Sequence, residues 1–234
     1  MNPGIHFFPA LANLFFPHVC CGCGTDLLEE KNIFCIYCLA AMPLTGFEQC
    51  AGNPVEKIFW GRAEIQSASA HLYFTKKSPV QQSLHRFKYK GRKEIGSYFG
   101  KCMGRALKKS GRFQDCQLIL PLPLYKSREQ KRGYNQAAVL GHAISAEMNI
   151  PQFMRCLERV KGTATQTHKY RIQRWQNMED KFRVKRKELI CGEHILLVDD
   201  VITTGATLEA CAKTLLRIEG VSLSMATLAH SVSA

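Results

Sequence analysis

Short apolar runs recur along the chain from about residue 58 and predict β-strands. Within residues 68–74, Ala70, Leu72 and Phe74 occupy alternate positions, which is the period of a strand with one buried face. Continuous apolar runs predict three further buried strands, over residues 117–122, 193–199 and 222–228.

Apolar residues at helical spacing fill the segments between these runs. Val80, Leu84 and Phe87 lie in helical register near the start of residues 79–109, a segment that predicts one or two helices. Two more helices are predicted over residues 134–148 and 207–218, the second ending near Gly220. Strands that alternate with helices are typical of an α/β protein with a mostly parallel sheet flanked by helices.

The first 56 residues differ from this pattern, so we predict a small module over residues 1–56 and an α/β domain over residues 57–234. The opening segment predicts a short amphipathic helix that packs on the protein, with weak membrane contact as the alternative. Its apolar residues are Phe7, Phe8, Leu11, Leu14, Phe15 and Phe16. No basic residues begin this segment, prolines interrupt it, and it lacks the roughly 18 apolar residues of a membrane span. We therefore expect a cytoplasmic protein without a transmembrane segment, with peripheral attachment at the inner face of the membrane as the alternative.

Positive charge is concentrated in the second module. The chain of 234 residues has a formal net charge of +13. Residues 1–60 contain two Lys/Arg and five Asp/Glu, whereas residues 76–112 contain twelve Lys/Arg and one Glu, and residues 155–187 contain eleven and three. Such a distribution attracts phosphates, either of a small ligand or of a nucleic-acid backbone. The alternative is a solvated basic face without a ligand.

Clustered cysteines in the first module predict a structural metal. Eleven cysteines in a chain without a secretion signal argue against a disulfide framework, because the number is odd and the compartment reducing. Two C-x-x-C pairs, Cys20/Cys23 and Cys35/Cys38, supply four thiolates for a tetrahedral Zn²⁺. Cys21 competes with its neighbours and Cys50 is a substitute, and a reactive thiol cluster is the alternative to a zinc ribbon.

The most informative stretch is the strand end and loop over residues 195–207. An apolar strand delivers Asp199 and Asp200 to its C-terminal edge, where open α/β sheets bind ligands. The carboxylates suit two ribose hydroxyls, and backbone N–H groups with threonine hydroxyls suit a 5-phosphate. The loop and helix start contain Val201, Thr203, Thr204, Gly205, Ala206 and Thr207. A plain strand–turn–helix with a threonine N-cap is the alternative.

This stretch resembles the signature of type I phosphoribosyltransferases, which bind phosphoribosyl pyrophosphate (PRPP). The resemblance implies that Asp199 and Asp200 hold the ribose, that residues 201–207 hold the 5-phosphate, and that Mg²⁺ accompanies the pyrophosphate. Two further stretches resemble the competence protein F family, namely Arg132-Gly133-Tyr134-Asn135-Gln136 and the spaced residues Gln166, Arg171, Asn177 and Phe182. That family also carries an N-terminal double C-x-x-C, so the resemblance covers nearly the whole chain.

The resemblance assigns pyrophosphate-binding roles to two segments. Residues 123–128 would form the pyrophosphate loop, with Lys126 and Arg128 as its cations. Residues 161–177 would form the loop that closes over PRPP and brings the catalytic Arg171 or Arg174 to the leaving pyrophosphate. Cations are needed there because the leaving group carries concentrated negative charge. Both segments could instead be basic surface or helix caps.

The sequence leaves two main functions to weigh. The resemblance implies natural competence, in which the protein handles imported single-stranded DNA, with competence-machinery proteins as further partners. Aromatic residues interleaved with cations fit base stacking, in the segment Arg86, Phe87, Lys88, Tyr89, Lys90 and Arg92. A buried Phe87 with solvated lysines is the alternative. The second function is transfer of phosphoribose from PRPP to a nitrogenous acceptor, for which no acceptor pocket is evident, and a PRPP-sensing operon regulator is a third.

Overall fold

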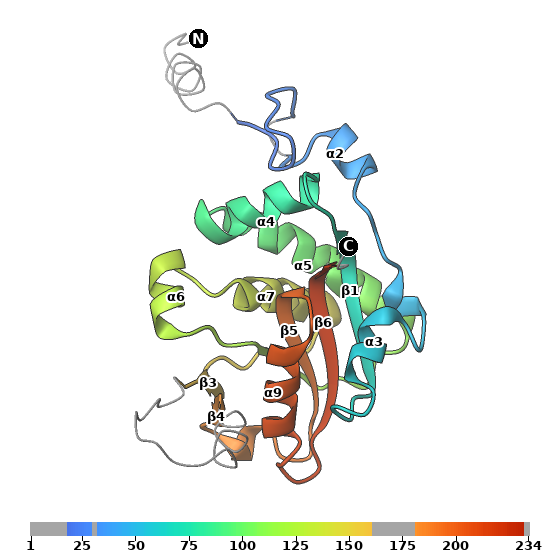
Figure 1. Cartoon of the computed structure of the whole chain (residues 1–234), viewed down its shortest axis with the longest axis vertical. Helices are drawn as coiled ribbons and strands as arrows, with labels where there is room; N and C mark the ends of the chain where they lie inside the picture. The colour runs from blue at the N-terminus through green and yellow to red at the C-terminus, as the bar shows by residue number, and fades with distance from the viewer. Residues whose placement is uncertain (1–17, 30–31, 161–180, 232–234) are drawn as a thin grey trace, which may run out of the picture.

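A four-stranded parallel sheet forms the centre of the protein (Figure 1). The computed structural model describes residues 18–29, 32–160 and 181–231. The strand order is β1 (Ser67–Phe74), β6 (Ser222–Ser231), β5 (His194–Ile202) and β2 (Leu118–Pro121), and each neighbouring pair is parallel. The predicted mostly parallel sheet is therefore confirmed, and its carboxyl edge is the end at which Asp199 and Asp200 lie.

Helices cover both faces of the sheet because alternate residues of the central strands point in opposite directions. Leu196 and Val198 of β5 pack with α5 (Lys93–Ser110) and α7 (Gln136–Met148). Ile195 and Leu197 pack with α9 (Ala206–Leu215) on the other face. Figure 1 shows α9 and α3 (Pro54–Phe59) in front of the sheet and α5 and α7 behind it. The result is a three-layer α/β fold.

Shorter elements complete the described chain. These are α2 (Ile36–Ala40), η1 (Phe47–Gln49), α4 (Pro79–Tyr89), α6 (Lys126–Arg132), β3 (Leu157–Arg159), β4 (Phe182–Val184) and η2 (Lys187–Leu189). Strands β3 and β4 pair antiparallel and form a second sheet. Three-residue strands give no periodic signal, and the sequence did not predict them. None of the described helices has the length and apolar character that crossing a membrane requires.

Three predicted boundaries differ from the observed ones. Strand β5 continues to Ile202, beyond the predicted end at Asp199, because its pairing with β6 extends to His230, so Val201 and Ile202 belong to the strand and not to the predicted loop. Helix α6 begins at Lys126, so only the first part of the predicted loop over residues 123–128 is irregular. Strand β6 runs three residues beyond the predicted end.

The predicted boundary at residue 57 falls inside α3. Phe47 and Val55, from the predicted first module, are buried in the same core cluster as Leu197 of β5. Leu44 also bridges to Leu72 of β1. The division of the chain into two domains stays a prediction, and the predicted N-terminal helix lies outside the described residues.

Candidate functional site

Two carboxyl groups lie at the carboxyl edge of the central sheet, in strand β5. Because neighbouring residues of a strand point to opposite faces, Asp200 lies on the face of α4 and Asp199 on the face of α9. Lys88 of α4 places its Nζ 2.9 Å from Oδ2 of Asp200. The backbone N–H of Asp200 donates to Oδ1 of Asp199 over 2.8 Å. The pair therefore sits at the edge that the sequence predicted, but its members face different partners.

The two acids also differ in their electrostatic environment, which changes the pKa of Asp199. Burial raises the pKa of Asp199 to about 7, and the negative charge of Asp200 adds to this rise. The hydrogen bond from the backbone of Asp200 and the positive charges of Lys88 and Arg159 act in the opposite direction. Such a carboxyl group binds a proton near neutral pH and becomes a better acceptor as the pH rises.

The loop after β5 presents unpaired donors. Helix α9 has Gly205 as its N-cap and no side-chain cap, so the alternative of a threonine N-cap is wrong. Thr203, Thr204 and Ala206 are exposed, and no hydroxyl of the threonines at 203, 204 and 207 is hydrogen-bonded to another described residue. Free N–H groups at a helix N-terminus together with exposed hydroxyls fit a phosphate.

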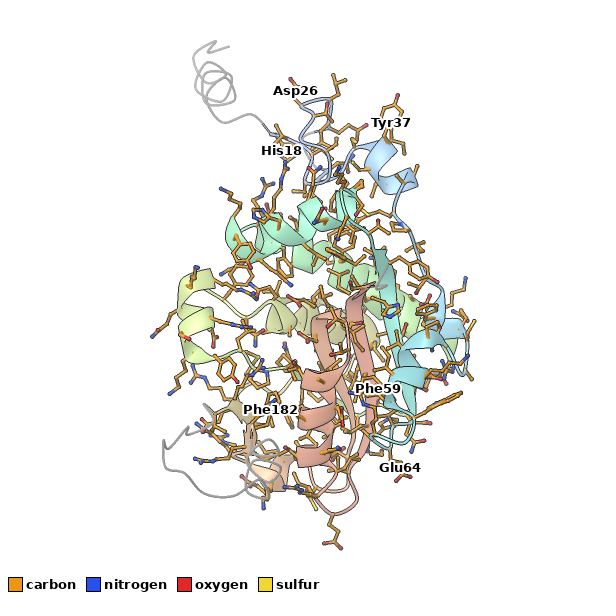
Figure 2. The ribbon with its side chains drawn as sticks, in the orientation of Figure 1. His18, Asp26, Tyr37, Phe59, Glu64 and Phe182 are labelled. Atoms are coloured by element: carbon orange, nitrogen blue, oxygen red, sulfur yellow. The ribbon has the colours of Figure 1, made fainter. Side chains whose placement is uncertain are left out.

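Residues from the N-terminal part of the chain hold this loop in place. Arg62 donates from Nη1 to the carbonyl of Thr204 over 3.0 Å and forms an ion pair with Glu209 of α9. Gly205 has a φ of +73°, and an added Cβ would lie 2.5 Å from Cγ2 of Ile58 and 3.3 Å from Phe59. Figure 2 labels Phe59, a buried residue of α3 beside this loop. No sequence pattern pointed to Arg62, which is 142 residues away from Thr204.

The segment after β2 approaches the same edge. Lys126 and Arg128 are exposed on α6, and the guanidinium of Arg128 lies 5.9 Å from the centre of the Tyr125 ring. Asn135 caps α7 by accepting from the N–H of Ala137, and its Nδ2 donates to the carbonyl of Leu122 over 3.0 Å. Its second bond fixes the start of the predicted pyrophosphate loop.

The two predicted catalytic residues, Arg171 and Arg174, lie outside the described residues. A different arginine, Arg159, reaches the Tyr125 ring from β3, with 4.2 Å between its guanidinium carbon and the ring centre. Sequence reasoning missed Arg159. The only sequence signal was the basic character of residues 155–187.

The predicted nucleic-acid segment does not form one exposed face. Phe87 is fully buried in the core, so the prediction that its ring stacks on bases is wrong for this conformation. Lys88 is paired with Asp200, Arg92 forms an ion pair with Glu94, and Arg86 donates to the carbonyl of Cys20 over 2.5 Å. Tyr89 and Lys90 remain exposed.

Tyr89 connects the end of α4 to α6. The guanidinium of Arg132 lies 5.5 Å from the centre of the Tyr89 ring. Lys90 after α4 and Lys126, Arg128 and Lys131 of α6 are exposed, and we call these four cations the α4–α6 basic face. This face contains Lys90 of the predicted nucleic-acid segment together with Lys126 and Arg128, which the resemblance assigned to the pyrophosphate loop.

The four predicted zinc ligands come together. The sulfurs of Cys20, Cys23, Cys35 and Cys38 all lie within 4.8 Å of one another. Those of Cys23 and Cys35 are 3.7 Å apart, close to the ~3.8 Å edge of a tetrahedron with Zn–S bonds of about 2.3 Å. Burial opposes ionisation of Cys20, but backbone N–H groups, that of Cys35 foremost, outweigh it and lower its pKa to about 6. The cluster fits a zinc ribbon.

Neither alternative ligand belongs to this cluster. Cys21 is fully buried in the core beside Phe34, and Cys50 is exposed and lies outside the group of four sulfurs. The ring of Phe34 packs against Phe99 of α5 at 5.2 Å between centroids. Cys21 and Phe34 thus attach the ribbon to the helical layer, above α4 in Figure 1.

The parallel sheet, the acid pair at its edge and the glycine-containing loop before α9 define a protein of the phosphoribosyltransferase fold. In agreement, residues 129–233 match the family model described as the phosphoribosyl transferase domain. Over 220 residues the chain is 30% identical to Competence protein F of Haemophilus influenzae, which covers 87% of this chain and 93% of that protein. It therefore belongs to the competence protein F family.

Two other relatives support this assignment. Competence protein ComFC of Bacillus subtilis is 32% identical to this chain over 199 residues, and the match spans 85% of this chain and 78% of that relative. DNA utilization protein YhgH of Escherichia coli K12 is 30% identical over 142 residues, and the match spans 59% of this chain and 62% of that relative.

Proposed function

We propose that the carboxyl edge of the sheet binds PRPP. The observation that carries this proposal is that acceptors for ribose hydroxyls and donors for a phosphate lie together at the carboxyl edge of the sheet. Asp199 and Asp200 offer acceptors for ribose hydroxyls, and the loop at residues 203–207 offers exposed donors for the 5-phosphate. Mg²⁺ would neutralise charge on the pyrophosphate, and carboxylate oxygens such as those of Asp199 and Asp200 are suitable ligands for it.

Calorimetric titration of the zinc-loaded protein with PRPP and Mg²⁺ tests this proposal. We expect saturable binding in the unchanged protein and at least a tenfold weaker affinity in the double variant Asp199→Asn/Asp200→Asn, because amides cannot replace charged acceptors. Glu219→Gln is the matched control, since Glu219 is exposed and precedes β6 at the opposite end of the sheet. Equal binding by the double variant would contradict the proposal.

We further propose that the protein acts in natural transformation by handling imported single-stranded DNA in the cytoplasm. The names of its relatives refer to competence and to DNA utilization. The α4–α6 basic face supports this role, because three of its four exposed cations belong to α6, which contacts the exposed ring of Tyr89 through Arg132, and the fourth, Lys90, follows Tyr89 in the chain. Cations that neutralise phosphates and an aromatic ring that stacks on a base are the usual elements of single-strand binding.

The salt dependence of oligonucleotide binding checks this role. Fluorescence anisotropy with single-stranded DNA should show affinity that falls steeply with salt, since bound cations release counterions. The variant Lys90→Gln/Lys131→Gln should lower the slope by roughly 0.7 for each phosphate that is no longer neutralised. Lys101→Gln/Lys109→Gln removes the same charge from exposed positions of α5 and should leave the slope almost unchanged. Equal effects of the two variants would indicate non-specific attraction.

Transfer of phosphoribose to a nitrogenous acceptor is the second candidate function. Lys88 and Arg159 favour it, because both bring positive charge to the carboxylates from outside the phosphate loop. An enzyme of this kind releases pyrophosphate from PRPP only when the correct base is supplied, which distinguishes it from a DNA-binding protein with a regulatory PRPP site.

A further inference from the structure

Arg159 lies on the inner face of strand β3. Leu157 and Arg159 alternate with Glu158, so Leu157 is buried in the core while Glu158 points away and pairs with Lys185 over 2.5 Å. The inward direction of Arg159 therefore follows from the register of the strand. Its guanidinium lies over the Tyr125 ring at 4.2 Å and near the Phe182 ring at 5.5 Å. Figure 2 labels Phe182 on β4.

Among the described residues, the charge of Arg159 has no carboxylate partner. Across residues 18–29, 32–160 and 181–231, no acidic oxygen lies within 4.0 Å of its guanidinium nitrogens, whereas Arg183 on the paired strand contacts Glu158. The Nε of Arg159 is buried and has no hydrogen-bond partner within the described part of the chain. A buried donor without a partner is destabilising, so such a group in a native protein calls for an explanation such as a bound water, ion or ligand.

The aromatic contacts fix where this cation points. Tyr125 belongs to the segment after β2, which pairs with β5, the strand that carries the acid pair. Arg128 approaches the same Tyr125 ring. The positive charge of Arg159 also opposes the rise in the pKa of Asp199, as the smallest of its causes, so the guanidinium lies within electrostatic reach of Asp199 without contacting it. Tyr125, Arg128 and Arg159 thus form one cluster that follows β2, the strand paired with β5.

We propose that Arg159 binds the pyrophosphate group of the ligand. A planar guanidinium that lies over an aromatic ring points its N–H groups outward in its own plane, where they can reach two oxygens of one oxyanion. The 5-phosphate has its own donors in residues 203–207, so the pyrophosphate is the oxyanion left for Arg159. This inference rests on the proposed PRPP site and adds to it a residue that the sequence did not single out.

Titration of the zinc-loaded full chain with three separate ligands tests the inference. The ligands are PRPP, inorganic pyrophosphate and ribose 5-phosphate, each with Mg²⁺. We expect Arg159→Gln to weaken binding of pyrophosphate and of PRPP at least tenfold and to change ribose 5-phosphate by less than twofold. Arg159→Lys keeps the charge but lacks the planar guanidinium, so its loss of pyrophosphate affinity should be intermediate. This variant also tests the inference if Arg159→Gln does not fold.

Arg183→Gln is the matched control, because Arg183 is paired with Arg159's neighbour Glu158 and its side chain is 69% exposed. It should bind all three ligands normally. Unchanged pyrophosphate affinity in Arg159→Gln, or an equal loss for pyrophosphate and ribose 5-phosphate with a lowered melting temperature, would overturn the inference. If the unchanged protein binds pyrophosphate through Arg159 but not ribose 5-phosphate, the inference holds and the PRPP site fails. If it binds ribose 5-phosphate but not pyrophosphate, the inference fails while the ribose-phosphate part of the site holds.

Discussion

Asp199 and Asp200 are adjacent in sequence, yet each has a different environment. Asp200 has Lys88 as a counter-ion, whereas Asp199 is partly buried near Cys211 and has a raised pKa. A carboxyl group whose pKa is raised by folding favours the native state only while it is protonated. The stability that it contributes is complete below its ordinary pKa and is lost as the pH rises to about 7.

Asp199→Asn should therefore stabilise the protein without ligand, and more so at high pH. The amide cannot ionise, so the gain should be small at pH 4, increase through neutral pH and level off above pH 7 at roughly 4 kcal/mol. Urea unfolding between pH 4 and pH 8 measures it. Glu219→Gln should show no such trend. A gain at Asp199→Asn that is the same at every pH would show that ionisation is not its cause.

At the scale of single elements, the loop before α9 depends on two separate requirements at Gly205. Its positive φ disfavours any side chain, and Ile58 of α3 occupies the place of a Cβ. The loop is thus shaped by packing against α3 as well as by its own sequence. Helix α4 has a comparable double role, since Phe87 enters the core while Lys88 reaches Asp200.

Gly205→Ala should destabilise the protein by roughly 2 to 4 kcal/mol, as the sum of backbone strain and overpacking. Thermal unfolding measures the loss. Gly133→Ala is the control, because Gly133 has a φ of +77° with nothing within 4 Å of an added Cβ. It should show the backbone strain alone, on the order of 1 kcal/mol. Equal losses at the two glycines would mean that Ile58 moves aside without cost.

At the scale of the whole molecule, α4 joins the cysteine cluster to the acid pair. Arg86 donates to the carbonyl of Cys20, and Lys88, two residues later, pairs with Asp200. The outer side of the ribbon is exposed, and Tyr37 of α2 points away from the protein there (Figure 2). A small ribbon has little core of its own, so the metal and the contacts with α4 and α5 both hold it.

Zinc removal should consequently destabilise the whole protein and not the ribbon alone. We expect one zinc per chain by elemental analysis, and a melting temperature that falls by several degrees in the presence of a chelator or in Cys20→Ser. Cys191→Ser, at an exposed cysteine outside the cluster, should retain both the metal and the melting temperature. Full stability of the metal-free protein would show that the cluster is not structural.

Local patterns were sufficient for the main strands and helices, the four metal ligands and the position of the acid pair at a strand end, because short-range spacing encodes each of them. The sequence could not show that Phe87 is buried, that Lys88 turns to Asp200, or that Arg159 lies on Tyr125. These contacts join residues far apart in the chain, and they exist only once the helices and strands have packed together. The sequence alone thus predicted which acidic and loop residues form the site. Which cations lie near the acid pair was decided by the tertiary structure, because Lys88 and Arg159 come from other elements.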